Sequence, residues 1–252
     1  MIILPLSDKN PLNKIQKAYI TLLILLLCIG VFIYQISLSD HEAVVFLYAF
    51  GGIPSVIFGV TELPSEITLI PNWATLISSM FLHGGVMHLV GNMLFLWVLG
   101  DNIEDELGHG YFASFFLICG VVSALSHSIA DITSETPMIG ASGAVSGIIG
   151  AYLVLHPKAP IKTLFWWFVL EIPAWLLLGL WILIQLFNIL SPDEGSSTGI
   201  AWWAHVGGFA TGLVLIFMFR KKDLTLFDQN KDFPYSQKPT ITMRRGPWSS
   251  SR

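Results

Sequence analysis

Charged side chains are scarce in this sequence. Asp, Glu, Lys and Arg make up only 12% of the 252 residues, whereas 54% of the residues are hydrophobic. Because a soluble globular protein carries about a quarter charged residues, this deficit excludes an ordinary water-soluble fold. The composition instead indicates a protein that crosses a membrane several times.

Cysteine is rare, and the common cofactor-binding motifs are missing. Cys28 and Cys119 both lie inside apolar runs, which argues against a disulfide framework and against a thiolate metal site. The chain has no G-x-x-x-x-G-K sequence, no dinucleotide fingerprint and no basic stripe, so we expect no cofactor and no nucleic-acid partner. His83 and His88 are spaced by five residues and lack the glutamate of H-E-x-x-H, which disfavours a metalloprotease.

Long apolar runs are what the sequence has instead. A membrane-spanning helix needs about 20 mostly apolar residues. We therefore predict an all-α polytopic membrane protein, a bundle of six transmembrane helices at residues 17–38, 83–100, 110–129, 139–155, 163–190 and 200–220. The segment 39–82 is interrupted by Gly51-Gly52-Ile53-Pro54, which predicts a half-embedded loop of interfacial helices and not a further crossing.

The basic residues indicate how these helices are oriented. All 13 lysines and arginines fall in the N-terminal tail, in the 156–162 loop, at the end of the sixth helix or in the C-terminal tail; none occurs in the loops 39–82, 130–138 and 191–199. By the positive-inside rule, both termini are predicted to be cytoplasmic. The 101–109 loop is then cytoplasmic too, and its acidic residues do not count against this orientation.

This plan divides the chain into a cytoplasmic N-tail at 1–16, a six-helix core at 17–221 and a cytoplasmic C-tail at 222–252. The N-tail is polar and leads into an apolar run too long for a signal peptide, so we expect no cleavable signal. The C-tail contains three prolines and shows no periodicity, which predicts disorder.

Five polar side chains lie at the outer ends of the predicted second, fourth and sixth helices, which all run from outside to inside. They are His83, His88, Asn92, Ser142 and His205. Polar residues inside a bilayer are costly and usually face a bundle interior or a water-filled cavity. Such residues can also serve only to hydrogen-bond helices together. The convergence of five at one depth favours a functional site.

Two stripes of glycine predict how these helices pack. Each consists of residues four apart, Gly143 and Gly147 on the fourth helix and Gly208 and Gly212 on the sixth. Small residues at this spacing let two helix backbones approach closely in lipid. Packing along both stripes would bring Ser142 within hydrogen-bond distance of His205.

Ser142 and His205 have the chemistry of a nucleophile and its general base. A serine hydroxyl attacks a carbonyl once a neighbouring base takes its proton, and neutral histidine can do so near neutral pH. The oxyanion that develops needs donors, for which the Ser142 amide and the side chains of His88 and Asn92 are candidates. No carboxylate is expected within these helices to orient the histidine, so we predict a dyad and not a triad.

Two other polar residues are expected to stay outside this dyad. His83 lies about one turn above His88, where it is better placed to hydrogen-bond water or a loop. Glu171, beside Pro173, is expected on the fifth helix near its cytoplasmic end, on the wrong side of the membrane to assist His205.

Three motifs follow one another along the predicted helices: His83-x4-His88-x3-Asn92, Gly140-Ala141-Ser142-Gly143 and Ala204-His205-x2-Gly208-x3-Gly212. Together they resemble the rhomboid family of intramembrane serine proteases, over residues 17–220. The resemblance implies that Ser142 is the nucleophile and His205 the base, with His88, Asn92 and the Ser142 amide as the oxyanion hole. His83 and the glycines of the motifs are expected to support the site.

The resemblance also implies what the protein acts on. Substrates of the family are single-span membrane proteins cut near the outer end of their helix, so the expected partners are transmembrane proteins and membrane lipid. The fifth helix and the 191–199 loop are implied to form a gate for them. The compact six-span plan indicates a bacterial inner membrane, whereas the oligomeric state and the natural substrate are not indicated.

One position departs from the family pattern. Many relatives carry an aromatic residue under the histidine ring, four positions after the nucleophile, where this chain has Ser146. What orients His205 is therefore not indicated, although Trp202 and Trp203 are candidates.

Two other functions stay open. A transporter or channel would use the same side chains as a proton or solute path, but the sequence has no internal repeat and these residues lie toward one face. An inactive relative that escorts membrane proteins is the second alternative, and the presence of both Ser142 and His205 argues against it.

Overall fold

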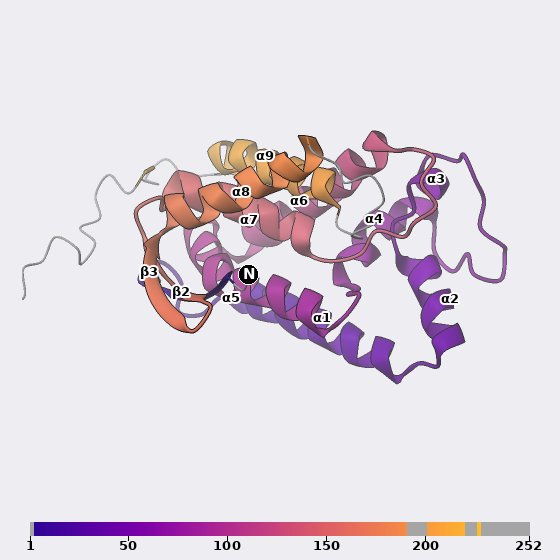
Figure 1. Ribbon diagram of the computed structural model, residues 1–252, viewed down its shortest axis with the longest axis horizontal. Helices are drawn as coiled ribbons and strands as arrows, with labels where there is room; N and C mark the ends of the chain where they lie inside the picture. Colours follow the sequence, from indigo (N-terminus) through magenta and orange to yellow (C-terminus); the bar gives the residue numbers. More distant parts are fainter. Residues whose placement is uncertain (1–2, 191–200, 220–225, 228–252) are drawn as a thin grey trace, which may run out of the picture.

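The computed structural model describes residues 3–190, 201–219, 226 and 227. This part of the chain is mostly helical (Figure 1). Four helices are long and apolar enough to cross a membrane: α1 (Tyr19–Ser37), α5 (Val86–Leu107), α6 (His109–Ala130) and α9 (Trp202–Phe219). Two apolar helices are shorter, α7 (Ser142–Leu155) and α8 (Ala174–Leu190). The predicted gate loop 191–199 and nearly all of the C-tail lie outside the described residues.

The short helix α7 forms the centre of the bundle. It contacts α5, α6, α8 and α9 (Figure 1), and 12 of its 14 residues are buried. At about 1.5 Å per residue, 14 residues extend roughly 21 Å, less than the roughly 30 Å of a hydrocarbon core. A helix of this length therefore leaves at least one of its ends below a membrane surface.

The backbones of α7 and α9 touch at the two glycine stripes. A Cβ atom on Gly208 would overlap the carbonyl of Gly143, and one on Gly212 would overlap the carbonyl of Gly147. Further along, a Cβ on Gly150 would lie 2.5 Å from the backbone oxygen of Phe209. No larger residue fits at these positions unless the two helices move apart.

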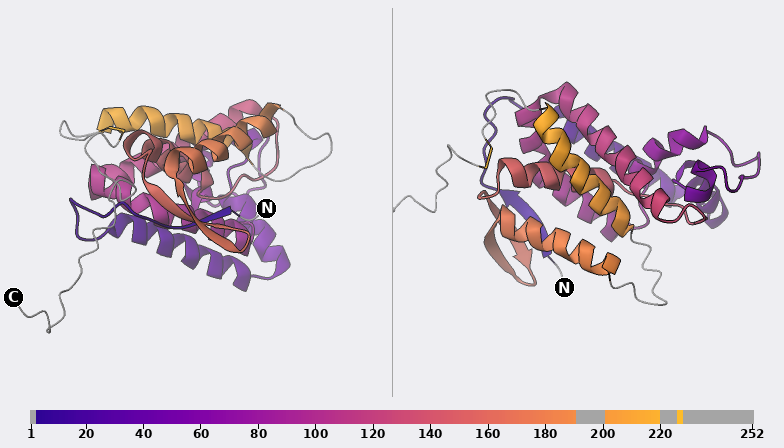
Figure 2. Two further views of the ribbon diagram at one scale, coloured as in Figure 1. Left: turned by 60° about the vertical axis from the view of Figure 1, so that its left-hand side comes forward. Right: turned by 90° about the horizontal axis from the view of Figure 1, so that it is seen from above.

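The prediction of one helix over 163–190 is wrong in its first part. Residues in that part form an antiparallel hairpin of β2 (Pro160–Phe165) and β3 (Phe168–Pro173), and α8 begins only at Ala174. The sheet has the order β1-β2-β3, because β1 (Ile3–Asp8) pairs with the free edge of β2. Figure 2 shows this sheet along one flank of the bundle, beside α8.

Local sequence explains the hairpin. Residues 163–169 read T-L-F-W-W-F-V, and β-branched and aromatic side chains favour strands. Proline cannot donate a backbone hydrogen bond, and Pro173 lies where the strand ends and the helix begins. Glu171 consequently lies on β3 and not on a helix, and its carboxylate pairs with Lys9 at 2.6 Å.

The predicted 101–109 loop is also wrong. Helix α5 continues to Leu107, and Gly108 alone, with φ of 81°, separates it from α6. The acidic residues of this stretch therefore lie on the last turns of α5, where Glu104, Asp105 and Glu106 are buried.

These buried carboxylates hold the N-terminal segment. Glu104 accepts hydrogen bonds from the backbone amides of Ile20 and Thr21 at 2.9 and 2.7 Å, and from the Thr21 hydroxyl at 2.7 Å. It thereby caps the first turn of α1, where a negative charge also opposes the helix dipole. Asp105 accepts from three successive amides, those of Asn13, Lys14 and Ile15.

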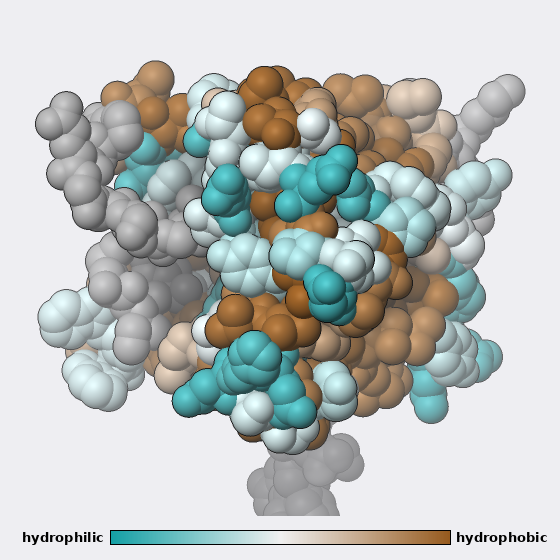
Figure 3. Space-filling model, turned by 90° about the vertical axis from the view of Figure 1, so that its right-hand side faces the viewer, coloured by the Kyte–Doolittle hydropathy of each residue, from teal (hydrophilic) through white to brown (hydrophobic). Residues whose placement is uncertain are grey.

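The segment 39–82 contains five short helices, with a non-helical loop at residues 58–71. They are α2 (Asp40–Phe50), α3 (Pro54–Ile57), η1 (Asn72–Ala74), α4 (Thr75–Ser78) and η2 (Ser79–Phe81). The longest has 11 residues, too few to cross a bilayer. Ser39 and Glu42 form a capping box at the start of α2, and the Ser39 hydroxyl lowers the pKa of Glu42. Figure 3 looks onto this end of the molecule, where hydrophilic residues lie among apolar ones.

The glycine contact generates a first prediction. Gly212→Ala is expected to lower the free energy of unfolding by at least about 1–3 kcal/mol, because the added methyl meets backbone that no rotamer change can move. Gly179→Ala is the matched control on α8, since a Cβ there has no atom within 4 Å. Unfolding in detergent measures both variants, and equal losses would contradict the contact.

The capping carboxylate generates a second prediction. Glu104→Ala is expected to cost about 3 kcal/mol or more, because it leaves the buried amide and hydroxyl of Thr21 and the partly buried amide of Ile20 without an acceptor. Glu62→Ala, at an exposed position, should stay within about 0.5 kcal/mol of the parent. Thermal unfolding tests the difference, and an unchanged melting temperature for Glu104→Ala would exclude the capping role.

Candidate active site

Ser142 and His205 face one another across the α7–α9 contact. Ser142 is the first residue of α7, and His205 lies in the first turn of α9. The Ser142 Oγ lies 2.9 Å from the His205 Nε2, and both residues are partly exposed. This is hydrogen-bond geometry, and in it the imidazole can accept the serine proton.

The His205 ring is held from a second side by α8. Its Nδ1 lies 2.7 Å from the Oε1 of Gln185, and the side-chain amide of Gln185 in turn donates to the Trp181 carbonyl at 3.1 Å. The ring of Trp181 lies 5.6 Å from that of His205 between centroids, and the ring of Trp202 lies 6.2 Å away, edge to face. Of the two tryptophan candidates, Trp202 makes this contact, while Trp203 is half exposed.

Ser146, in the position that is aromatic in many relatives, is fully buried. Its hydroxyl donates to the Ser142 carbonyl one turn earlier, at 2.6 Å. The aromatic contact of the His205 ring therefore comes from Trp181 on α8 and from Trp202. Sequence reasoning missed Gln185 and Trp181, although a buried amide within an apolar run is a signal of function in a membrane helix.

His88 and Asn92 lie on α5 and approach the turn before Ser142. The Nδ2 of Asn92 is buried and has no hydrogen-bond acceptor within the part of the chain that the structure describes. The Nδ1 of His88 accepts from the Gly84 amide at 3.4 Å, which leaves its Nε2 as the donor nitrogen. Two donors therefore converge beside the start of α7, where the first helical amides lack intrahelical partners.

Gly140 allows the side chains of His88 and Asn92 to approach the turn before Ser142. Its φ of 114° is a conformation that side-chain-bearing residues rarely adopt, and a Cβ would lie 2.7 Å from the His88 Nε2 and 3.5 Å from the Asn92 Nδ2. The Gly140 amide donates to the Ser79 carbonyl at 2.9 Å, and Gly52 pairs with Met138 in an isolated bridge. The segment 39–82 thus fixes the turn that leads into Ser142.

The remaining predicted residue, His83, and the carboxylate of Asp131 are bonded elsewhere than to Ser142 and His205. His83 lies before the start of α5, where its Nδ1 is 3.3 Å from the Phe81 carbonyl and its ring packs edge-on against His88. Asp131, after α6, is bound by the Thr133 hydroxyl, which lowers its pKa. Among the described residues, the partner of the His205 Nδ1 is therefore an amide and not a carboxylate.

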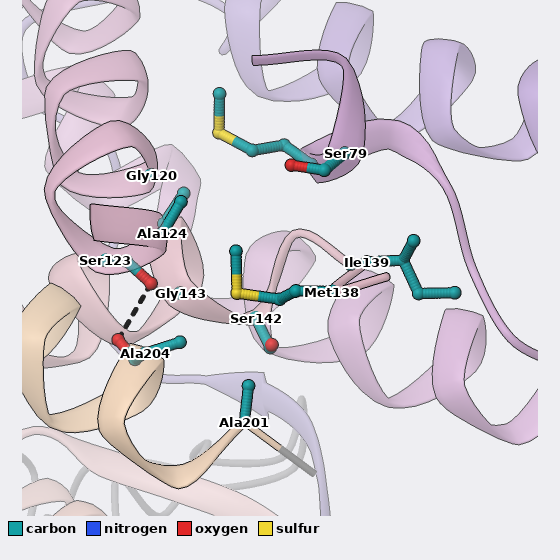
Figure 4. Close-up of a pocket in the computed structure, with 13 residues that line it drawn as sticks. Ser79, Gly120, Ser123, Ala124, Met138, Ile139, Ser142, Gly143, Ala201 and Ala204 are labelled. Carbon is teal, nitrogen blue, oxygen red and sulfur yellow. Dashed lines mark hydrogen bonds between the residues drawn. The ribbon is translucent and has the colours of Figure 1, made fainter. Parts of the chain in front are cut away.

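Two cavities meet at Ser142. The larger, of about 650 Å³, is an open cleft with polar and apolar walls, lined among others by His88, Asn92, Phe95, Ser142, Trp181 and His205. The smaller, of about 20 Å³, has Ser79, Ser123 and Ser142 among its lining residues (Figure 4). Ser123 donates to the Ala204 carbonyl at 2.8 Å there. That volume suits about one water molecule.

Comparisons with known proteins point to one family. The Rhomboid domain model matches residues 71–222, a range that contains all the site residues named above from α5, α7, α8 and α9. RHOMBOID-like protein 5 of Arabidopsis thaliana is 32% identical over 143 residues, covering 57% of this chain and 43% of that protein. Rhomboid protease GlpG of Klebsiella pneumoniae is 29% identical over 196 residues, covering 77% and 61%.

A mitochondrial relative matches as well. Rhomboid protein 1, mitochondrial, of Saccharomyces cerevisiae is 27% identical over 190 residues, covering 67% of this chain and 51% of that protein. The chain spans about half the length of the curated relatives it matches. These matches confirm the family resemblance found in the motifs, and they agree with an integral, multi-pass membrane protein.

Proposed function

The chain belongs to the rhomboid family, and on that premise we propose that it is an intramembrane serine endopeptidase with a Ser142–His205 dyad. The observation that carries the proposal is the 2.9 Å contact between the Ser142 Oγ and the His205 Nε2. A serine without such a base is a weak nucleophile, so this contact is what the chemistry needs first.

The proposed reaction has two steps, acylation of Ser142 and hydrolysis of the resulting ester. The His205 Nε2 takes the Ser142 proton while the Oγ attacks the peptide carbonyl carbon, and the tetrahedral intermediate then expels the amine, which receives that proton from His205. The result is an acyl ester on Ser142. A water molecule then attacks the ester, with His205 again accepting and returning the proton, and releases the carboxylic acid.

The oxyanion of each tetrahedral intermediate is stabilised by three donors. They are the backbone amide of Ser142, the Nε2–H of His88 and the Nδ2–H of Asn92. The buried and unpaired Nδ2 of Asn92 supports this role, because a buried donor without an acceptor costs stability and is rarely kept without a function. The small cavity at Ser142 has room for the water that the second step consumes.

The membrane arrangement that fits this chemistry has six helices. In it α7 and α8 cross with the four longer helices, both termini are cytoplasmic, and the segment 39–82 is half embedded on the outer side. Ser142 then lies below the outer surface, since α7 is too short to reach both faces. A bacterial inner-membrane location stays a prediction, and the relatives include a mitochondrial protein.

The substrates that suit this site are single-span membrane proteins. A helix in lipid has its backbone groups paired, so it must unwind before a carbonyl can reach Ser142. The open cleft beside α8, with apolar side chains next to the dyad, can take such an unwound segment. Helix-destabilising residues in the substrate would lower the energy of unwinding.

Ser142 gives the third prediction. A fluorophosphonate is expected to label the purified protein at Ser142, and Ser142→Ala should lose both the label and cleavage of a single-span substrate in proteoliposomes, by several orders of magnitude. The melting temperature should stay close to the parent value. Ser114→Ala, on the exposed face of α6, is the control and should keep full activity. Undiminished cleavage by Ser142→Ala would refute the proposal.

Asn92 gives the fourth prediction. Asn92→Ala is expected to lower kcat by about 10²–10³-fold, the usual loss for one oxyanion donor. Its stability should be unchanged or higher, because the variant removes a buried group that has no acceptor. Asn188→Ala on α8, whose amide donates to the Ile184 carbonyl of its own helix, should change neither quantity. A loss of stability with normal kcat would show that Asn92 serves packing.

A further inference from the structure

We propose that Gln185 is a positioning residue that fixes the tautomer and the ring orientation of His205 for proton transfer. This inference rests on the proposed function, and it assigns to an amide the place that a carboxylate has in a Ser–His–Asp triad. It starts from the contact between the Gln185 Oε1 and the His205 Nδ1, at 2.7 Å.

Gln185 is buried, and both ends of its amide are bonded. It is 5% exposed, on a helix whose other residues are mostly Leu, Ile, Trp and Phe. A buried amide costs free energy unless its donors and acceptor find partners. Here Nε2 donates to the Trp181 carbonyl at 3.1 Å, and Oε1 faces His205.

The Trp181 carbonyl decides which way the amide points. A carbonyl oxygen only accepts hydrogen bonds, so the nitrogen of the amide must face it and the oxygen must face His205. An amide oxygen also only accepts, and the His205 Nδ1 must therefore carry a proton. In neutral imidazole the lone pair is then on Nε2, which is the atom that lies 2.9 Å from the Ser142 hydroxyl.

The opposite tautomer is disfavoured by the same contact. It would set the lone pair of Nδ1 against the lone pairs of the Gln185 Oε1, and its Nε2–H could not accept the serine proton. Trp181, one helical turn before Gln185, packs beside the same ring, with the two ring planes inclined at 42°. Gln185 and Trp181 thus contact the imidazole from one helix.

Two variants separate positioning from packing. Gln185→Leu keeps a similar volume and removes the acceptor, whereas Gln185→Glu, as a buried neutral carboxyl group, keeps an acceptor for His205 and an O–H donor for the Trp181 carbonyl. We expect Gln185→Leu to lower kcat about 10²-fold with KM within about twofold, and Gln185→Glu to retain most of the activity. The loss is smaller than the roughly 10⁴-fold that a reversed tautomer causes in a triad, because leucine leaves both tautomers accessible. Asn188→Leu on the same helix is the control.

A measurement without substrate makes the test independent of activity. In ¹⁵N-histidine spectra of the full-length protein in nanodiscs, the His205 signal is identified by its loss in His205→Ala. The parent should show the Nδ1–H tautomer and Gln185→Leu a mixture of the two. The spectra of the parent and the variant are compared at the same pH.

The outcomes are distinguishable. An unchanged Nδ1–H tautomer in Gln185→Leu, or equal losses of kcat in the Leu and Glu variants, would overturn the role of Gln185 while leaving the dyad intact. Failure of the dyad itself would instead appear as cleavage by Ser142→Ala, whatever the tautomer of His205.

Discussion

The contact between the α7 and α9 backbones is the constraint on which the site depends. A side chain larger than glycine at Gly208 or Gly212 would meet the α7 backbone and separate the two helices, and the residues at the start of each helix would separate with them. A serine hydroxyl and an imidazole have short reach, so a shift of about 1 Å at their helices would break a 2.9 Å contact. These glycines let the helices pack, and the same packing is required for the contact between Ser142 and His205.

Two kinds of buried polar group lie on α5: carboxylates with several hydrogen-bond donors, and an amide donor without an acceptor among the described residues. At one end of the bundle, Glu104 and Asp105 satisfy a whole set of backbone amides and hold the N-terminal segment. Toward the other end, Asn92 has a buried donor that has no acceptor among the described residues. The first arrangement lowers the free energy of the fold, and the second leaves a donor free for the oxyanion of the proposed mechanism. The carboxylates that stabilise the fold and the donor proposed for catalysis thus lie on different parts of α5.

Much of this arrangement could be predicted from the sequence, but not all. Apolar length located α1, α6 and α9 to within a few residues, and the motifs led to the family. Length and hydropathy alone could not distinguish the hairpin at 160–173 from the first turns of a helix, because both are apolar. The acidic end of α5 was read as a loop because charges usually indicate solvent, whereas here backbone amides take the place of water. Gln185 was missed because its role depends on a partner 20 residues away.

The sheet at the start of α8 has a mechanical consequence. The helix is fixed at its beginning, where Ala174 and Trp175 donate to the backbone of Ala159 and Pro157, while Gln185 lies eleven residues further along, or roughly 16 Å. When a helix tilts about its fixed first turn, its far end moves most, so a tilt of α8 by about 10° would move Gln185 by roughly 3 Å. That is enough to detach it from the imidazole, so a small tilt of α8 alone would release the His205 ring from Gln185.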